Sequence, residues 1–369
     1  MTNFSKYDYL IVGAGFFGSV FAREMTDAGK KCLVIDKNSH IAGHCYTEKI
    51  EDIIVHKYGP HIFHTDKKEL WDYAQRFCEF KPYCHRIKVN YRGQIYSFPI
   101  NLMTLYQLWG VKTPEEAKKC LEEKKVPCAD PQNLEEWTLS QVGREIYEIF
   151  IRGYTIKQWE KDPKELPPFL IKRLPIRLSY NDTYYNDPYS GMPEGGYTKL
   201  FENLLKGIEV RLNEDYFKNR QEYDKMANQV VYTGRIDEFF DYKYGDLEYR
   251  TLRFETQMLP IPDFQGSSVI NYTDEKVPYT RINEYKHFDW KDVPYTYVAK
   301  EFPDTWRREK TPYYPVNTAA NNELFQKYKS EAEKQTKYIF GGRLADFKYY
   351  DMHQVIEASL NKVKQLLNR

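Results

Sequence analysis

Residues 7–36 read YDYLIVGAGFFGSVFAREMTDAGKKCLVID, and this stretch decides the fold. The apolar run 7–12 is typical of a buried strand, and residues 16–27 carry the spacing of a helix. Ala28-Gly29 forms a turn, after which residues 31–35 supply a second apolar strand. The stretch therefore predicts a strand, a helix and a second strand in that order, the repeating unit of an α/β protein.

The turn between the first strand and the helix carries the pattern GxGxxG at Gly13, Gly15 and Gly18. Gly13 allows a tight turn, Gly15 lets the backbone approach a pyrophosphate, and Gly18 lets the helix pack closely on the strand. Asp36 ends the second strand, at the place where an acidic side chain accepts hydrogen bonds from ribose hydroxyls. These features predict a Rossmann-like domain that binds a dinucleotide. The alternative is a glycine turn that holds no cofactor.

The composition excludes several classes of partner. The 369 residues are too many for one hydrophobic core, so we expect about two or three domains. The net charge of +1 gives no electrostatic basis for binding nucleic acid or an anionic membrane. No apolar run is long enough to span a bilayer, and from the short polar start we expect no signal peptide. The six cysteines form no CxxC pair, which is typical of reduced thiols and indicates a cytoplasmic protein.

The pattern changes along the chain indicate where it leaves the nucleotide-binding domain. Residues 83–99 alternate as a hairpin around Arg92-Gly93. Residues 102–174 are mostly helical, with Thr113 as a cap and Pro114 at the first helical position. Residues 249–298 alternate as an antiparallel sheet would. We expect a nucleotide-binding domain of residues 1–80, 190–248 and 320–369, a helical domain of residues 101–178, and an antiparallel sheet domain of residues 81–100, 179–189 and 249–319.

The stretch HKYGPHIFHT at residues 56–65 holds three histidines close to Cys45. The spacing of His56, His61 and His64 fits no usual zinc pattern, so we predict no metal site. A surface or core role for any one of these histidines is the plain alternative. The Gly-Pro-His turn nevertheless places the His61 imidazole on a loop of fixed geometry.

Four stretches together closely resemble the bacterial UDP-galactopyranose mutase family: GAGFFG at 13–18, HKYGPHIFHT at 56–65, GYTIKQW at 153–159, and GGR at 341–343 followed by KYYDM at 348–352. The resemblance runs from Tyr7 to about residue 367. One departure is Ala42-Gly43-His44-Cys45, where relatives commonly carry Gly-Gly-Asn-Ala, and it touches the loop beside the cofactor. The resemblance implies that this protein, like the members of that family, is a flavoenzyme that catalyses a non-redox reaction.

The resemblance implies an α/β protein with a Rossmann-like, glutathione-reductase-like FAD-binding domain, an inserted helical domain and an antiparallel β-sheet domain. It implies that FAD is the cofactor and that the reduced form is active. His61 is expected beside flavin N5, and the alternative is that its ring only fills space there. The residues expected to contact the cofactor are Gly13, Gly15, Phe17, Gly18, Asp36, Lys37, Gly43, His44, His61, Thr233, Gly234, Arg343 and Met352.

The same resemblance assigns the substrate site. Arg173 and Arg281 are expected to act in catalysis by clamping the pyrophosphate, so that replacing either should leave the fold and the flavin content unchanged. By spacing alone, Tyr154 and Trp159 are more typical of the core of a helical bundle, but the resemblance reverses this preference and places them around the uridine. The residues expected to bind substrate are Tyr154, Trp159, Tyr184, Tyr185, Arg250, Asn271, Tyr314, Tyr349 and Asp351.

The implied activity is the interconversion of UDP-galactopyranose and UDP-galactofuranose through a sugar adduct at N5 of the reduced flavin. It implies an external reductant such as NAD(P)H, a homodimer, and a product used in cell-surface polysaccharide. Two alternatives stay open: an FAD-dependent oxidase or dehydrogenase, and a protein that binds nucleotide sugars without catalysis. A further alternative is a mutase that also acts on UDP-N-acetylgalactosamine.

Overall fold

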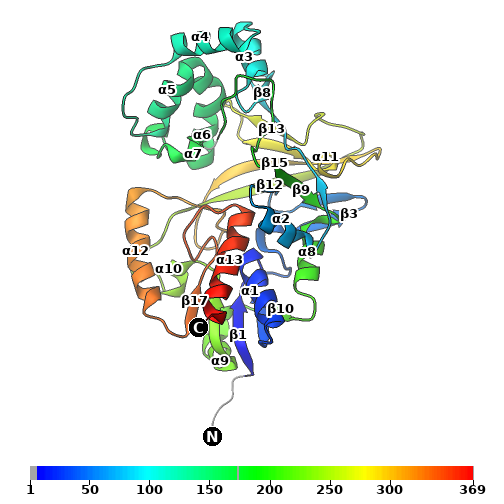
Figure 1. Cartoon of the computed structure of the whole chain (residues 1–369), viewed down its shortest axis with the longest axis vertical. Coiled ribbons are helices and arrows are strands. Elements are labelled where there is room, and N and C mark those ends of the chain that lie inside the picture. The colour runs from blue at the N-terminus through cyan, green and yellow to red at the C-terminus, as the bar shows by residue number, and fades with distance from the viewer. Residues whose placement is uncertain (1–5, 173, 369) are drawn as a thin grey trace.

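The computed structural model describes residues 6–172 and 174–368 of the chain. Three parts are stacked along its long axis (Figure 1). A parallel sheet with its helices lies at the end nearest the N-terminus, a second sheet lies in the middle, and a helical region lies at the far end. The α/β class predicted from residues 7–36 is confirmed.

Five strands of the described chain form the parallel sheet, in the order β10-β2-β1-β11-β17. Its central strands are apolar on both faces because helices cover both: Ile11 packs in the cluster that includes helices α1 and α13, while its neighbour Leu10 packs beside Tyr223 of α9. The bounds of these elements are β1 Tyr7–Val12, β2 Cys32–Asp36, β10 Glu209–Leu212, β11 Ala227–Tyr232, β17 Tyr338–Phe340, α1 Phe16–Asp27, α9 Arg220–Met226 and α13 Met352–Leu367.

The middle sheet contains seven strands of the described chain, in the order β16-β12-β15-β14-β13-β7-β8. Residues 87–98 form the predicted hairpin. One pairing corrects the expectation of an antiparallel sheet, because β13 runs parallel to β7. These two strands are far apart in the sequence, and the long connection between them leaves their relative direction free. The bounds are β7 Ile87–Tyr91, β8 Gln94–Phe98, β12 Tyr249–Leu259, β13 Val269–Tyr272, β14 Arg281–Glu284, β15 Thr296–Thr305 and β16 Tyr314–Pro315.

Smaller elements join these two sheets. A hairpin of β3 and β4 carries His56 at its end, and a small sheet in the order β5-β9-β6 carries His64. The bounds are β3 Thr47–Ile50, β4 Ile53–His56, β5 Phe63–Thr65, β6 Phe80–Pro82, β9 Tyr189–Pro193, α2 Lys68–Gln75, α8 Gly196–Leu204, α10 Ile236–Phe239, α11 Lys286–Asp289 and α12 Ala319–Glu333.

The helical region confirms the predicted cap. The Thr113 side chain accepts a hydrogen bond from the Glu116 N–H, with Pro114 in the first turn of α4. A π-helical segment, Tyr147–Arg152, joins α5 to α6 and brings Tyr154 and Trp159 to face the sheet. The bounds are α3 Leu102–Trp109, α4 Pro114–Lys124, α5 Leu134–Ile146, α6 Gly153–Trp159 and α7 Phe169–Lys172. The three-domain division of the chain stays a prediction.

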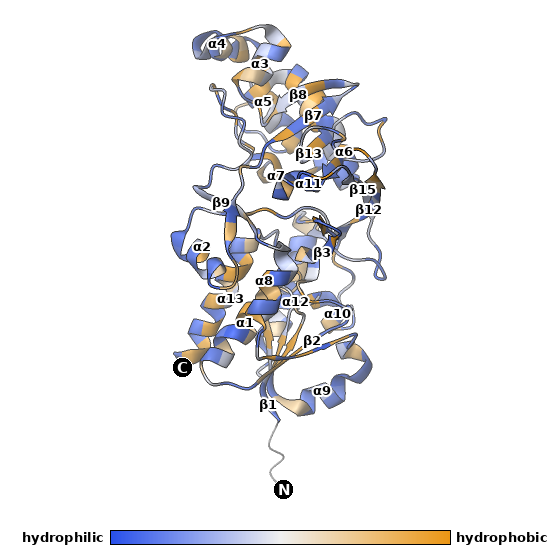
Figure 2. Cartoon of the chain, turned by 90° about the vertical axis from the view of Figure 1, so that its right-hand side faces the viewer, coloured by the Kyte–Doolittle hydropathy of each residue, from blue (hydrophilic) through white to orange (hydrophobic). Residues whose placement is uncertain are grey.

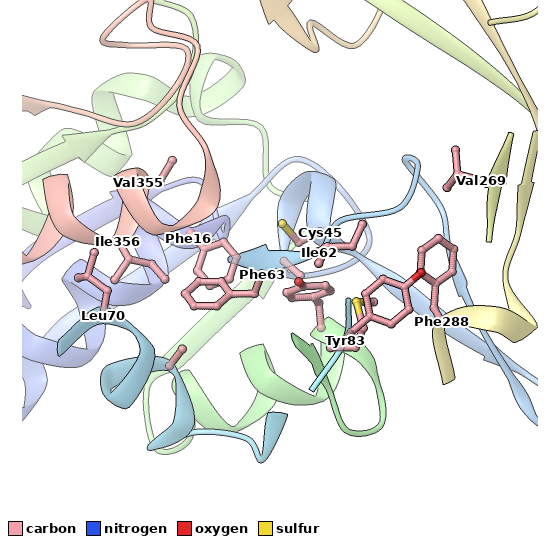
Figure 3. Close-up of a cluster of buried hydrophobic side chains, with 14 of the residues drawn as sticks. Phe16, Cys45, Ile62, Phe63, Leu70, Tyr83, Val269, Phe288, Val355 and Ile356 are labelled. Atoms are coloured by element: carbon pink, nitrogen blue, oxygen red, sulfur yellow. The ribbon is translucent and has the colours of Figure 1, made fainter. Parts of the chain in front are cut away.

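One apolar core links the parts. Figure 3 shows it running from Val355 and Ile356 of α13, past Phe16 and Phe63, to Phe288 beside the middle sheet. Figure 2 shows the apolar residues gathered in the strands near β1 and the polar residues on the outer helices. Within residues 6–172 and 174–368, no helix has the length and apolar character needed to cross a membrane.

Candidate active site

A cavity of about 660 Å³ lies at the carboxyl ends of β1, β2 and β11. Ligands of open α/β sheets bind at this edge. The cavity gathers every residue predicted to contact the cofactor except Gly18: Gly13, Gly15, Phe17, Asp36, Lys37, Gly43, His44, His61, Thr233, Gly234, Arg343 and Met352.

The glycine turn is shaped to receive a phosphate group. Gly13 has a φ of +110°, and a Cβ there would collide with the Thr233 hydroxyl. A Cβ on Gly15 would meet open space, and Gly15 offers no side chain to the first N–H groups of α1. These N–H groups are therefore available to an anion at the positive end of the helix dipole. Gly18 lies behind the turn, where a Cβ would collide with the Gly13 carbonyl oxygen, so its role is close packing.

Asp36 also stabilises this turn. Its Oδ2 accepts a hydrogen bond of 2.8 Å from the Ala14 N–H, and its Oδ1 accepts one of 2.9 Å from the Asn38 N–H. The Asn38 side-chain amide donates a further hydrogen bond of 2.9 Å to Oδ1. A carboxylate has about four acceptor positions, so the buried Asp36 keeps capacity for one ribose hydroxyl. At the opposite side of the cavity, Arg343 donates to the carbonyl oxygens of Tyr313 and Tyr350, which fixes its guanidinium.

Two half-buried histidines, His44 and His61, line this cavity, and the buried His56 accepts a hydrogen bond from the His61 N–H. Burial and the nearby Arg343 lower the pKa of His44 to about 3 and the pKa of His61 to about 4. Burial lowers the pKa of His56 to about 3. All three are therefore neutral near pH 7. His61 Nδ1 donates to the Gly59 carbonyl oxygen at 2.8 Å, which assigns the proton to Nδ1 and leaves Nε2 as an acceptor.

His44, from the stretch that departs from the family pattern, stacks on Tyr313 with ring centroids 4.7 Å apart. Tyr313 is followed by Tyr314, which stacks on Tyr349 at 5.3 Å. This aromatic wall leads from the first cavity to a second one, because both Tyr314 and Tyr349 line the second cavity.

The second cavity, of about 130 Å³, lies between the helical region and the middle sheet. It is lined by Arg281, predicted to clamp the pyrophosphate, and by six of the nine residues predicted to bind substrate: Tyr154, Trp159, Tyr184, Asn271, Tyr314 and Tyr349. Arg173 lies outside the residues that the structure describes.

Arg281 is held from two sides. Its Nη2 donates to the Tyr154 hydroxyl, and its Nε lies 3.3 Å from Glu301 Oε1. Glu301 is only 2% exposed, and burial raises the pKa of its carboxyl while Arg281 opposes the shift. Sequence reasoning missed Glu301. The signal for it is the alternation along β15, which places Glu301 on the same face as the buried Ala299 and opposite to the exposed Lys300.

Three residues predicted to bind substrate, Arg250, Tyr185 and Asp351, do not line the second cavity. Arg250 is buried and donates to the Gln158 carbonyl oxygen at 3.0 Å and to Glu160. Tyr185 stacks on His64 with ring centroids 3.6 Å apart. Asp351 is the N-cap of α13, and its N–H donates to Gln354 Oε1 at 2.9 Å. The side chains of Arg250 and Tyr185 therefore contact other protein groups, and Asp351 begins α13.

Within the described part of the chain, one set of potential metal ligands lies close together. This set does not include the histidines of residues 56–64. The set is Asp263, Glu284 and His287, outside both cavities. Glu284 already accepts hydrogen bonds of 2.9 Å from the N–H groups of Phe264 and Gln265. His287 Nε2 lies 3.2 Å from Asp263 and 3.4 Å from Glu284, and these carboxylates raise the pKa of His287. An ion pair accounts for this group.

Comparison with known proteins gives a consistent result. A family model described as UDP-galactopyranose mutase matches residues 149–349, and one described as NAD(P)-binding Rossmann-like domain matches residues 11–77. The chain is 40% identical to a dTDP-fucopyranose mutase of Escherichia coli, covering 95% of this chain and 96% of that protein. It is 39% identical to a probable UDP-galactopyranose mutase of Klebsiella pneumoniae, covering 97% of this chain and 94% of that protein.

The fold is also shared with a crystal structure of reduced UDP-galactopyranose mutase, with a TM-score of 0.76 and 13% identity, covering 98% of this chain and 96% of that chain. The predicted Rossmann-like domain is thereby confirmed. From the matched family model and from relatives that align over nearly their whole length, we conclude that this chain belongs to the UDP-galactopyranose mutase family, whose members are isomerases.

Proposed function

We propose that the protein is an FAD-dependent mutase that interconverts UDP-galactopyranose and UDP-galactofuranose. The observation that carries the proposal is the arrangement of the two cavities. A dinucleotide-type cavity lined by neutral histidines is joined by the aromatic wall Tyr313-Tyr314 to a cavity that holds a fixed arginine and several aromatic rings. This arrangement suits a cofactor and a nucleotide sugar bound side by side.

FAD fits the first cavity. The α1 N-terminus and Arg343 would hold its pyrophosphate, Asp36 would hold the adenosine ribose, and the α13 N-terminus near Met352 would face the isoalloxazine. When bound and reduced, the flavin would supply the nucleophile that the reaction requires. The open space beside Gly15 and the uncapped N–H groups of α1 are the features of this chain that fit the group.

The second cavity would hold the nucleotide and the diphosphate. Tyr154 and Trp159 offer aromatic faces to the base. Arg281, already oriented by Glu301 and Tyr154, would stabilise negative charge on the diphosphate as it departs from the sugar, with Arg173 as the proposed second cation. Rings along the wall would exclude water from the sugar between the two cavities.

His61, which lines the first cavity, would interact with both the sugar and the flavin. Because Nδ1 is bound to the Gly59 carbonyl oxygen, Nε2 is the atom able to accept a proton or a hydrogen bond. Its low pKa keeps the imidazole neutral, so no imidazolium would compete with the arginines for the departing diphosphate.

A dTDP-6-deoxy sugar is the second candidate substrate, because the E. coli relative at 40% identity is a dTDP-fucopyranose mutase. The two candidates differ by the 2′-hydroxyl, by the methyl group on the base and by the hydroxyl at sugar C6. UDP-N-acetylgalactosamine is a further candidate for the same site.

The proposal includes a cytoplasmic homodimer that receives electrons from NAD(P)H and supplies furanose for cell-surface polysaccharide. The family resemblance supports these points. Sedimentation of the holoenzyme would give the oligomeric state, and anaerobic bleaching of the flavin bands by NADH or NADPH would identify the reductant.

The test is turnover of UDP-galactofuranose by dithionite-reduced protein under anaerobic conditions, with no electron acceptor. We expect UDP-galactopyranose to form, and the oxidised protein to be inactive. UDP-N-acetylgalactosamine and dTDP-fucopyranose in parallel assays rank the candidate substrates. A protein that turns over only with an electron acceptor is an oxidase or dehydrogenase instead. One that binds UDP without conversion is a binding protein.

A further inference from the structure

We propose that Lys157 is a positioning residue, which holds the helix of Tyr154 and Trp159 against the hairpin of Arg281 and so sets the geometry of the nucleotide-diphosphate site. The inference rests on the proposed function, because it concerns the binding of the nucleotide part of the substrate.

The Lys157 ammonium lies in a cage of backbone carbonyl groups. Its Nζ donates to the carbonyl oxygens of Tyr272, Asp274, Val277 and Tyr279, at 2.7, 2.9, 3.0 and 2.9 Å. An ammonium has three N–H groups, so one of them is shared between two acceptors. Burial lowers the pKa of Lys157 to about 8, with Asp274 and Glu275 opposing the shift, so the group is still mostly protonated at pH 7.

One of these carbonyls belongs to Tyr272, the last residue of β13, and the other three belong to the loop that joins β13 to β14. This loop connects Asn271, at the end region of β13, to Arg281, the first residue of β14. Both residues line the second cavity. The cation therefore determines how the loop folds between two residues of the proposed substrate site.

The contact between Lys157 and the carbonyl groups also affects the second cavity, because Tyr154 of the same helix lines that cavity. Tyr154 precedes Lys157 by three residues, which places the two on neighbouring positions of one face of α6. The Tyr154 hydroxyl accepts a hydrogen bond from Arg281 Nη2. The helix also approaches the loop backbone directly, since a Cβ on Gly153 would collide with the Thr273 carbonyl oxygen. Helix and hairpin are thus joined at the cage on one side and at the Tyr154–Arg281 bond on the other.

A surface ion pair on the same loop provides a matched control. Arg152 pairs with Glu275, and its side chain is 40% exposed. This ion pair also connects the helical region to the loop, but it lies at the solvent-exposed surface. Pairs of this kind contribute little to stability. Arg152→Gln therefore removes a cation and a contact to the loop while leaving the carbonyl cage intact.

The experiment measures the dissociation constant of UDP, together with kcat and KM, for the FAD-loaded variants. We expect Lys157→Met to weaken UDP binding at least about tenfold, equivalent to about 1.4 kcal/mol. Its flavin content should be that of the unsubstituted protein, and Arg152→Gln should stay within about twofold of that protein. If Lys157→Met does not fold, Lys157→Gln, which retains N–H donors, takes its place in the same comparison.

A double-mutant cycle with Tyr154→Phe separates positioning from a general effect on stability. If Lys157 acts through Tyr154 and Arg281, Lys157→Met should cost much less UDP affinity in the Tyr154→Phe background than alone. Additive losses, or normal UDP binding by Lys157→Met, would overturn the proposal. Failure of the unsubstituted protein to bind UDP or dTDP would instead contradict the proposed function.

Discussion

Arg281 and Glu301 form an ion pair beside the second cavity, with Nε and Oε1 3.3 Å apart. Glu301 is almost inaccessible to solvent, whereas the Arg281 side chain keeps 27% exposure on the cavity side. The carboxylate holds one edge of the guanidinium and the Tyr154 hydroxyl holds another, so the orientation of Arg281 is set before any substrate arrives. An arginine preorganised in this way stabilises developing negative charge without reorganisation during the reaction.

Arg281→Ala should lower turnover at least about tenfold, equivalent to about 1.4 kcal/mol, because the departing diphosphate loses a charge-assisted contact. The structure also leads us to expect a loss of stability, by about 3–5 kcal/mol, because Glu301 is left buried and unpaired. The sequence alone suggested an unchanged fold. Adding Glu301→Gln should restore the melting temperature without restoring turnover. Normal turnover of either variant would remove Arg281 from the mechanism.

Trp159→Ala should weaken UDP binding by about 1–3 kcal/mol, because an aromatic face for the base is lost. Trp290→Ala is the matched control, since Trp290 is 75% exposed and does not line either cavity. Titration calorimetry with UDP measures both variants. Loss of flavin or of the fold in Trp159→Ala would show instead that this ring is part of the core.

His61→Ala should keep FAD and the fold but lose most activity, because the acceptor Nε2 is removed from the cofactor cavity. His61→Asn and His61→Leu test whether the imidazole only fills space. His64→Ala should be milder, since His64 pairs with Asp187 and stacks on Tyr185. Assays with chemically reduced flavin exclude defects in reduction, and near-normal rates in all His61 variants would make it a packing residue.

Gly15→Ala and Gly18→Ala should fail in different ways. A Cβ on Gly15 meets open space, so the apoprotein should melt normally while the methyl group blocks the pyrophosphate and FAD is lost. A Cβ on Gly18 collides with the Gly13 carbonyl oxygen, so the fold itself should be destabilised. Thermal melting of the apoproteins and flavin absorbance of the purified variants distinguish the two. FAD bound normally by Gly15→Ala would place the cofactor elsewhere.

His287→Gln should cost stability at low pH and not at high pH. Glu284 and Asp263 raise the pKa of folded His287 above its ordinary value of 6.5, so its stabilising charge is present below that value. The contribution disappears as the pH rises through the folded pKa. We expect a difference of about 1–2 kcal/mol in the free energy of unfolding near pH 5.5, falling toward zero near pH 9. A difference independent of pH would indicate that packing, and not charge, is responsible.

Residues 7–36 determined the Rossmann-like unit by themselves, because its signals are local. Strand, glycine turn, helix and acid follow one another directly, and the Thr113 cap of α4 is equally local. The cofactor residues from distant segments, such as Thr233 and Arg343, were reached through the family resemblance, and the fold brings them to the same cavity.

Only the tertiary structure decided which charges meet in the interior. Glu301 lies on β15 and Arg281 on β14, and nothing in the sequence between them marks the pair. The carbonyl cage of Lys157 forms between segments more than one hundred residues apart, as does the parallel pairing of β13 with β7. Hydrogen bonds and ion pairs of this kind depend on where the hydrophobic core places each backbone, and a buried charge becomes stable only once that placement supplies its partner.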